Sequence, residues 1–472
     1  MPKDHPPPMP QADPPAPTDQ PARAAAGPVD TAKLSVVADI CRRAAADLVR
    51  QGYKPDGEKT LRRFGLNEIC RYMLPLTAPE LRAALKANPD WPQGHLIGGQ
   101  PFFTLEEVNA LRECLDSTLP KVDLMSRARD ASSRSETAGH AKHPHGARSK
   151  AEPASPSSSS EAVGQAKIVT LCNFKGGVSK TTTAAHLAMA AALDGLNVLV
   201  VDLDSQASMS TLFGETAKDE TETAYAMMAW DRARAQHAEA PEAVDPALKD
   251  YLDITADDLI RPTHWPTIDI LPAQLNLYWA EFQIPVWLQS SRGWRFWDAL
   301  ENFLTAEKLL DDYDLVIVDT PPALGYLTIN ALAAADILLV PVGASFIEFD
   351  STGRFFDMLA TTFSSIEETL AASHDTPPKF EWDAVQVLLT RYDDSQQGEL
   401  GDLIEAYLGD MVSKHRQSYT ALVGQAGERV SGIYEAPLAD FNPQTYRRGR
   451  ETFDESWAVL KGLLAASRAR SA

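Results

Sequence analysis

Short apolar runs recur along the C-terminal two thirds of the chain, separated by longer segments that show helical periodicity. Each run is a near-continuous stretch of Val, Ile and Leu, and the runs occupy residues 168–171, 198–201, 268–271, 315–318, 337–340 and 385–389. Runs of this kind are typical of parallel strands that are buried on both faces. The pattern therefore predicts a doubly wound, mostly parallel α/β fold that binds its ligand at the carboxyl ends of the strands.

The apolar pattern of residues 56–120 predicts a second, smaller and mainly helical domain. A helix over residues 66–73 is followed by a short turn, and Thr77 and Glu80 then form a capping box for a second helix. A glycine pair between apolar pieces in 95–103 predicts a hairpin wing, after which another capping box starts a further helix.

The second of these helices carries Arg82 and Lys86 four residues apart, on one face. Two helices joined by a short turn, with basic residues on the second, follow the helix-turn-helix plan, in which the second helix enters the major groove of DNA. We therefore predict a winged helix-turn-helix DNA-binding domain. The alternative of a small helical domain without a DNA contact fits the same pattern.

The remaining N-terminal segments differ in composition. Residues 1–28 are rich in Pro and Ala, which predicts a disordered tail. Residues 29–55 contain a helix whose apolar positions follow an a/d pattern. That stripe either pairs two protomers or packs on its own domain. Residues 121–164 combine scattered Arg and Lys with Ser and Pro, which predicts a flexible basic linker.

Charge divides the chain into two unlike parts. Residues 1–165 hold 21 Lys and Arg against 20 Asp and Glu, so of the total net charge of −21 the remaining residues carry −22. A strongly acidic body argues against simple electrostatic binding of nucleic acid. The four cysteines have no metal-ligand spacing, the N-terminus lacks the apolar core of a signal peptide, and no apolar run is long enough for a membrane span. We expect a cytoplasmic protein with reduced cysteines.

The main chemical motif lies in residues 167–183, where an apolar strand leads into a glycine-rich loop and then a helix. Backbone N–H groups of such a loop point at phosphate oxygens. Lys180 would reach the β- and γ-phosphates, and the Thr181 hydroxyl would hold Mg²⁺. The predicted phosphate-binding residues are Lys175, Gly176, Gly177, Val178, Ser179, Lys180, Thr181 and Thr182.

Three carboxylates follow two of the later strands. Asp202 and Asp204 come directly after the run at 198–201, and Asp319 ends the run at 315–318. A carboxylate at such a strand end can orient an attacking water in phosphoryl transfer or approach Mg²⁺ through the metal's water shell. We assign Asp319 the approach to Mg²⁺ through water. The predicted ligands of the site are ATP and Mg²⁺.

The loop departs from the usual phosphate-loop pattern, with Phe174 at the first glycine position and Ser179 at the second. It has instead a second lysine, Lys175, in the arrangement Lys-Gly-Gly-x-x-x-Lys-Thr. This resembles the deviant Walker A motif of the ParA/MinD ATPases, which implies that 165–472 is a ParA-type ATPase domain. The resemblance further implies that Lys175 reaches the nucleotide of a second subunit.

The same resemblance implies that Asp204 holds the hydrolytic water and that Asp202 is a structural or outer Mg²⁺ group. It places the loop after Thr390 near the adenine, so that Thr390 and Arg391 are further nucleotide contacts. Members of the family bind DNA without sequence preference as ATP-bound dimers, through surface Arg and Lys. The basic residues that we select for this role are Arg416, Arg447 and Arg448.

The N-terminal domain ends in Phe-Thr-Leu-Glu-Glu-Val-Asn-x-Leu-Arg. This resembles the long plasmid-partition ParA proteins and the RepA proteins of repABC-type replicons. The resemblance implies a homodimeric, nucleoid-associated DNA-partition ATPase of weak intrinsic activity. A ParB-like partner would stimulate hydrolysis, and the N-terminal domain would repress the protein's own operon. Two alternatives are a MinD-type ATPase at a membrane surface and a nucleotide-gated transcription regulator with little turnover. For the last helix, a packed terminal helix is favoured over a membrane-binding one.

Overall fold

The computed structural model describes residues 59–116, 165–290, 294–371, 380–427, 430–436 and 441–471. Contacts divide the chain into residues 1–51 and residues 52–472, and the described residues all belong to the second unit. The predicted tail, the predicted helix within 29–55 and the predicted linker lie outside the described residues.

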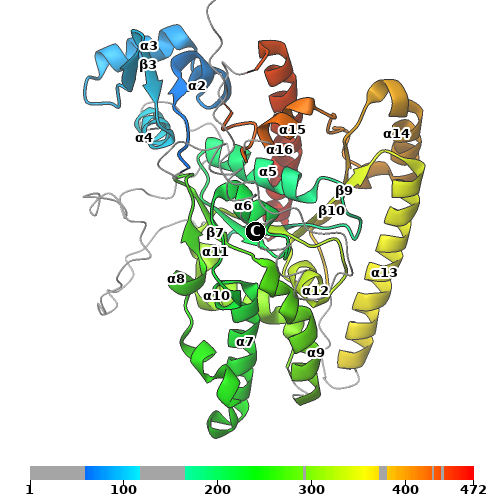
Figure 1. Ribbon diagram of the computed structural model, residues 1–472. Helices are drawn as coiled ribbons and strands as arrows, with labels where there is room; N and C mark the ends of the chain where they lie inside the picture. The colour runs from blue at the N-terminus through cyan, green and yellow to red at the C-terminus, as the bar shows by residue number, and fades with distance from the viewer. Residues whose placement is uncertain are drawn as a thin grey trace, which may run out of the picture. The chain divides into compact units, whose positions relative to one another are not determined.

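A seven-stranded sheet forms the centre of the larger domain, in the order β10-β9-β4-β8-β5-β7-β6 (Figure 1). All neighbouring strands are parallel except β6, which runs antiparallel to β7. The strands are β4 Lys167–Leu171, β5 Val198–Asp202, β6 Arg261–Pro262, β7 Ile268–Leu271, β8 Leu315–Asp319, β9 Ile337–Gly343 and β10 Ala384–Thr390. Every predicted strand is confirmed, and so is the mostly parallel sheet.

Helices cover both faces of this sheet, as strands that are buried on both faces require. Val169 and Val200 pack on one side with α5, whereas Ile168 and Val201 pack on the other with α7 and α10. The helices are α5 Lys180–Leu193, α6 Ser208–Phe213, α7 Ala224–Glu239, α8 Ala256–Leu259, α9 Ala280–Ser290, α10 Ala299–Ala306, α11 Leu309–Asp312, α12 Tyr326–Ala333, α13 Phe346–Ala371, α14 Asp394–Leu408, α15 Ala421–Gly427 and α16 Pro443–Ser471. Within the described part of the chain, none of them could cross a membrane.

The smaller domain contains the predicted helices and hairpin. Its elements are β1 Phe64–Gly65, α2 Leu66–Tyr72, α3 Ala78–Ala87, β2 His95–Ile97, β3 Gln100–Phe103 and α4 Leu105–Asp116. The Glu80 carboxylate accepts hydrogen bonds from the backbone N–H and the hydroxyl of Thr77, at the start of α3. Thr104 and Glu107 form the second capping box. Local sequence therefore sets where these helices begin.

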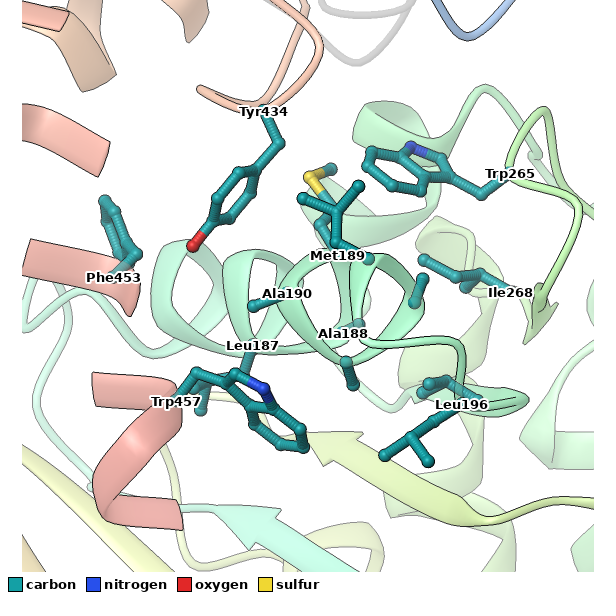
Figure 2. Packing of buried hydrophobic residues seen from close by; sticks show 14 of the residues in the cluster. Leu187, Ala188, Met189, Ala190, Leu196, Trp265, Ile268, Tyr434, Phe453 and Trp457 are labelled. Atoms are coloured by element: carbon teal, nitrogen blue, oxygen red, sulfur yellow. The ribbon is translucent and has the colours of Figure 1, made fainter. Parts of the chain in front are cut away.

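Helix α5 is enclosed on nearly all sides. Its sequence is rich in Ala, and every residue from Thr183 to Leu193 is buried. Figure 2 shows Trp457 of α16 and Tyr434 packing around it. Trp457, Leu460 and Leu464 are at most 4% exposed, which confirms the prediction of a packed terminal helix.

Two buried carboxylates, Glu68 and Glu435, join the smaller domain to α16 and to the segment that precedes it. Glu68 of α2 lies 3.1 Å from the guanidinium of Arg450 on α16. Glu435 lies 3.1 Å from the ammonium of Lys59, accepts a 2.7 Å hydrogen bond from the Trp265 indole and contacts His264. Burial alone would raise the pKa of Glu435, but the bond from His264 and the charge of Lys59 lower it to about 2.

Ser179 has a left-handed backbone. Its φ is 68° and its ψ is 27°, while Gly177 in the same loop has a φ of 77°. Glycine adopts this conformation freely, whereas a residue with a Cβ pays about 1–2 kcal/mol. Ser179 therefore holds a strained backbone conformation at a position where the usual motif has glycine.

We expect Glu435→Gln to lower the free energy of unfolding by about 3–5 kcal/mol at pH 7, because it leaves buried Lys59 and His264 without their carboxylate. The ionised Glu435 stabilises the fold above its ordinary pKa of 4.5, and this contribution is lost as the pH falls toward 2. Urea unfolding at pH 7 and pH 3.5 should show a smaller difference from wild type at the lower pH. Glu451→Gln, on the surface of α16, is the control. An equal difference at both pH values would contradict the assignment.

We expect Ser179→Gly to raise the free energy of unfolding by up to about 1 kcal/mol. Relief of the left-handed strain is partly offset by the larger entropy of glycine in the unfolded chain. Denaturant midpoints would measure the change. Ser179→Ala keeps a Cβ and should give no gain, so equal effects of the two substitutions would rule out backbone strain as the cause.

Candidate functional site

The phosphate loop lies at the carboxyl end of β4, between that strand and the first turn of α5. Lys180 is 7% exposed, and its ammonium donates a 3.1 Å hydrogen bond to the backbone carbonyl of Lys175 across the loop. Burial lowers the pKa of Lys180, and the nearby charges of Asp319 and Asp204 oppose that shift. The loop thus holds a desolvated cation beside the N–H groups of a helix start, which is an arrangement that binds phosphate.

Thr390 and Arg391 hold this loop from the end of β10. The Thr390 hydroxyl donates a 3.0 Å hydrogen bond to the carbonyl of Val178, and the Arg391 guanidinium donates one of 3.0 Å to the carbonyl of Gly177. Both residues therefore lie at the phosphate loop, whereas the resemblance placed them near the adenine base. Their observed partners are backbone carbonyls of the loop, so contact with a base stays a prediction.

Asp319 lies beside Thr181 at the end of β8. The Thr181 hydroxyl donates a 2.6 Å hydrogen bond to one carboxylate oxygen of Asp319, and the other oxygen is buried without a hydrogen-bond partner. Burial, together with the neighbouring charge of Asp202, raises the pKa of Asp319 well above its ordinary value. A cation beside Asp319 would stabilise its ionised, buried carboxylate.

This pair fits Mg²⁺. The ion prefers oxygen ligands and keeps several of its waters, so one hydroxyl, the oxygens of a bound nucleotide and a carboxylate reached through water make a sufficient set. Among the described residues, no cluster of three or more His, Cys, Asp or Glu could hold a metal ion by itself.

Both carboxylate oxygens of Asp202 accept hydrogen bonds from neighbouring residues. One oxygen accepts the backbone N–H of Asp204 at 3.1 Å, and the other accepts the N–H and the hydroxyl of Ser210 at 2.9 and 2.7 Å. Burial raises the pKa of Asp202 to about 6, although these bonds oppose the shift. This geometry favours the structural role over the metal role that the sequence left open for Asp202.

Asp204 is the half-buried carboxylate of the group, in the loop between β5 and α6. Its backbone is held by Asp202, and one of its own oxygens accepts the N–H of Gln206 at 2.9 Å. Its charge acts on both Lys180 and Asp319. The carboxylate therefore lies within electrostatic reach of the phosphate and metal positions.

Lys175 and Lys180 have different partners, and that of Lys175 is Glu348. Its ammonium lies 3.8 Å from the carboxylate of Glu348, in the first turn of α13, and its side chain is 30% exposed. The two lysines of the loop are thus separated, with Lys180 buried at the centre of the site and Lys175 at its outer rim.

Gln417 is a further residue at the site that the sequence does not indicate. Its carboxamide oxygen accepts a 3.1 Å hydrogen bond from Thr183, in the first turn of α5, while its buried amide nitrogen has no partner. Gln417 reaches the site because its backbone pairs with Leu389 of β10. No local motif marks it, so only the fold reveals it as a candidate ligand contact.

The residues predicted to bind DNA fall into two groups. Arg82 and Lys86 are exposed on α3, and Arg447 and Arg448 are exposed on α16. Arg416, in contrast, lies within 2.6 Å of Asp402 and 3.1 Å of Glu405. Its charge is already compensated, so the geometry does not support Arg416 as a phosphate contact.

Comparison with known proteins agrees with this geometry. A family model described as an AAA domain matches residues 166–372. A protein provisionally named replication protein A from Sinorhizobium fredii is 29% identical over 426 residues, which cover 89% of this chain and 90% of that protein. The chromosome partitioning protein ParA of Caulobacter vibrioides is 31% identical over 248 residues, covering 52% of this chain and 78% of the relative.

Among solved structures, one titled "Partition Protein" matches with a TM-score of 0.49 and 18% identity, covering 82% of this chain and 92% of that chain. The assignment rests on the sequence relatives and on the phosphate-loop geometry. The chain belongs to the ParA family of P-loop ATPases.

Proposed function

We propose that the protein is an ATP-dependent DNA-partition ATPase that acts as a homodimer. The observation that carries the proposal is the convergence of Lys180, Thr181 and Asp319 at one point, with Lys175 at the rim. The name of the Caulobacter relative, a chromosome partitioning protein, supports the biological role.

In this proposal, Lys180 and the loop N–H groups bind the phosphates of ATP. Thr181 and, through water, Asp319 hold Mg²⁺, which neutralises charge on the transferred phosphoryl group. Asp204 orients the attacking water and accepts its proton. Asp202 keeps Asp204 in place through the backbone bond at 3.1 Å. Thr390 and Arg391 keep the loop in its binding conformation.

Lys175 completes the site of a second subunit. For this it leaves Glu348 and contacts the other subunit's phosphates, so that ATP closes a sandwich dimer. The partly exposed position of the Lys175–Glu348 pair supports this, because an ion pair at 3.8 Å with solvent access costs little to exchange. Intrinsic hydrolysis is weak, and a ParB-like partner stimulates it.

DNA is bound in two ways. The ATP dimer binds DNA without sequence preference, for which Arg447 and Arg448 are candidate contacts, and this keeps the protein on the nucleoid. The smaller domain binds an operator and represses the protein's own operon, with Arg82 and Lys86 of α3 facing the groove. The exposure of these side chains on α3 supports the second role.

The alternatives have less support. A MinD-type protein at a membrane surface would need a free amphipathic helix, whereas the apolar face of α16 is packed against α5. A regulator with negligible turnover would not need Asp204 beside the phosphate site.

We expect Lys180→Ala to abolish measurable ATP binding, because the lost charge-assisted bonds cost roughly 3 kcal/mol or more. Asp204→Ala should keep ATP binding but slow hydrolysis by roughly 10²- to 10⁴-fold, which leaves a persistent DNA-bound dimer. Nucleotide titration, phosphate release and sedimentation on non-specific DNA would measure the three properties. Ser395→Ala, on the surface at the start of α14, is the control. Normal turnover by the Asp204 variant would overturn the assignment.

We expect Arg82→Ala and Lys86→Ala each to weaken binding to a DNA fragment from the protein's own promoter region by about 1–3 kcal/mol. Non-specific binding by the ATP dimer should stay unchanged. Fluorescence anisotropy with promoter and scrambled duplexes would separate the two modes. Arg354→Ala, on the exposed face of α13, is the matched control. Equal affinity of wild type for both duplexes would contradict operator binding while leaving the ATPase assignment intact.

A further inference from the structure

Five large apolar side chains stand exposed on one short stretch of the ATPase domain. They belong to the 3₁₀ turn η6 Leu275–Trp279 and to α9 Ala280–Ser290, and their exposed fractions are Leu275 68%, Tyr278 57%, Trp279 55%, Phe282 51% and Val286 57%. The rings form one group, since Phe282 lies 5.1 Å from Tyr278 and 5.8 Å from Trp279, centroid to centroid. We call these five residues the α9 patch. Contiguous exposed apolar groups of this size mark interaction surfaces.

The α9 patch begins at the edge of the sheet that carries the phosphate loop. β7 runs parallel to β5, and β5 and β4 each run parallel to β8, so their carboxyl ends lie at one edge. After β7, the backbone N–H of Ala273 donates a 2.8 Å hydrogen bond to the Ser210 hydroxyl, which itself donates to Asp202. The base of the patch is therefore tied to the loop that carries Asp204.

Helix α9 also holds the segment after Asp319. The Glu281 carboxylate accepts the backbone N–H groups of Tyr326 and Leu327 at 3.0 and 3.2 Å, at the start of α12. A Cβ at Gly325 would lie 2.5 Å from a Glu281 oxygen, so the two segments are in close contact. A partner that covers the α9 patch would therefore contact a helix that is joined to the loop with Asp204 and to the segment after Asp319.

A second exposed apolar pair lies at the same edge, beyond the phosphate loop. Phe346 and Ile347 follow the carboxyl end of β9 and are 74% and 72% exposed. They directly precede Glu348, the partner of Lys175. The proposed subunit contact of Lys175 is therefore flanked by exposed apolar side chains, and the α9 patch lies at the same edge of the sheet.

We propose that the α9 patch is covered by a second copy of this chain in the ATP-bound dimer, where Trp279 and Phe282 are its apolar anchors. This rests on the proposed function, because it is the dimer in which Lys175 reaches the other subunit. The size of the patch agrees with that occupant. Aromatic side chains bury roughly 150–250 Å² each when fully covered. Tyr278, Trp279 and Phe282 are 57%, 55% and 51% exposed, so these three alone supply roughly 240–410 Å² of the about 800 Å² per partner in a standard interface.

The test compares Trp279→Ala/Phe282→Ala with wild type by sedimentation velocity, in a non-hydrolysable ATP analogue. The expected result is a dimer dissociation constant raised at least tenfold, with nucleotide affinity of the monomer unchanged. Tyr407→Ala, which removes a 77% exposed aromatic side chain from α14, is the matched control and should dimerise normally. Both patch side chains are exposed, so the variant should fold, and its thermal unfolding would be recorded.

A second measurement uses the wild-type protein. Hydroxyl-radical footprinting should show Trp279 and Phe282 protected when the analogue is added, and unprotected in the Lys180→Ala variant. Unchanged labelling in a wild type that dimerises would overturn the proposal.

Other outcomes separate this proposal from the proposed function. If Lys175→Ala weakens the dimer but the patch variant does not, the ATP dimer stands and the α9 patch is not part of its interface. If the patch variant dimerises normally but loses stimulation by a ParB-like partner, the patch binds that partner instead, and the proposal is wrong. If the wild type binds the analogue and stays monomeric, the proposed dimer and its interface both fall.

Discussion

Two buried carboxyl groups at the ends of neighbouring parallel strands impose the main constraint on this molecule. Asp202 of β5 and Asp319 of β8 are directly paired in register, and both are fully buried. Like charges so placed are costly unless donors or cations compensate them. Asp202 is compensated by the Ser210 hydroxyl and by backbone N–H groups, whereas Asp319 has Thr181 and the nearby Lys180. The unpartnered oxygen of Asp319 gives a structural reason for the site to take a cation and a nucleotide together.

Helix α5 connects this site with the smaller domain and with α16. Its first turn holds the phosphate-binding residues, and its last carbonyl, that of Leu193, accepts a hydrogen bond from Arg112 of the smaller domain. In between, His186 stacks on Phe453 at 4.0 Å between ring centroids and accepts the backbone N–H of Ile433. Burial lowers the pKa of His186 to about 4, so it stays neutral there. Phosphate binding, the terminal helix and the smaller domain therefore share one buried helix.

Much of the fold was predictable because its signals are local. Val, Ile and Leu runs mark strands that are buried on both faces, and Thr–Glu capping boxes mark helix starts whatever the tertiary context. The phosphate loop with Lys180 and Thr181 is also a contiguous motif, and the nearness of Asp204 and Asp319 followed from the rule that parallel strands share a carboxyl edge. Ser179, an unusual residue for its position, has a left-handed backbone, which is a conformation that glycine adopts freely.

Contiguous sequence signals therefore predict the α/β architecture, the phosphate loop and the carboxylates around it, since each depends on neighbouring residues or on a regular strand order. Which charges are already paired becomes visible only in the folded structure. Arg416 is neutralised by Asp402 and Glu405, Lys175 rests against Glu348, and Glu281 caps a helix more than 40 residues further on. These pairs join distant segments through side chains whose burial and direction no local pattern specifies. The exposure of the α9 patch has the same origin, because apolar residues along 275–286 are compatible with a buried face until the fold leaves them exposed.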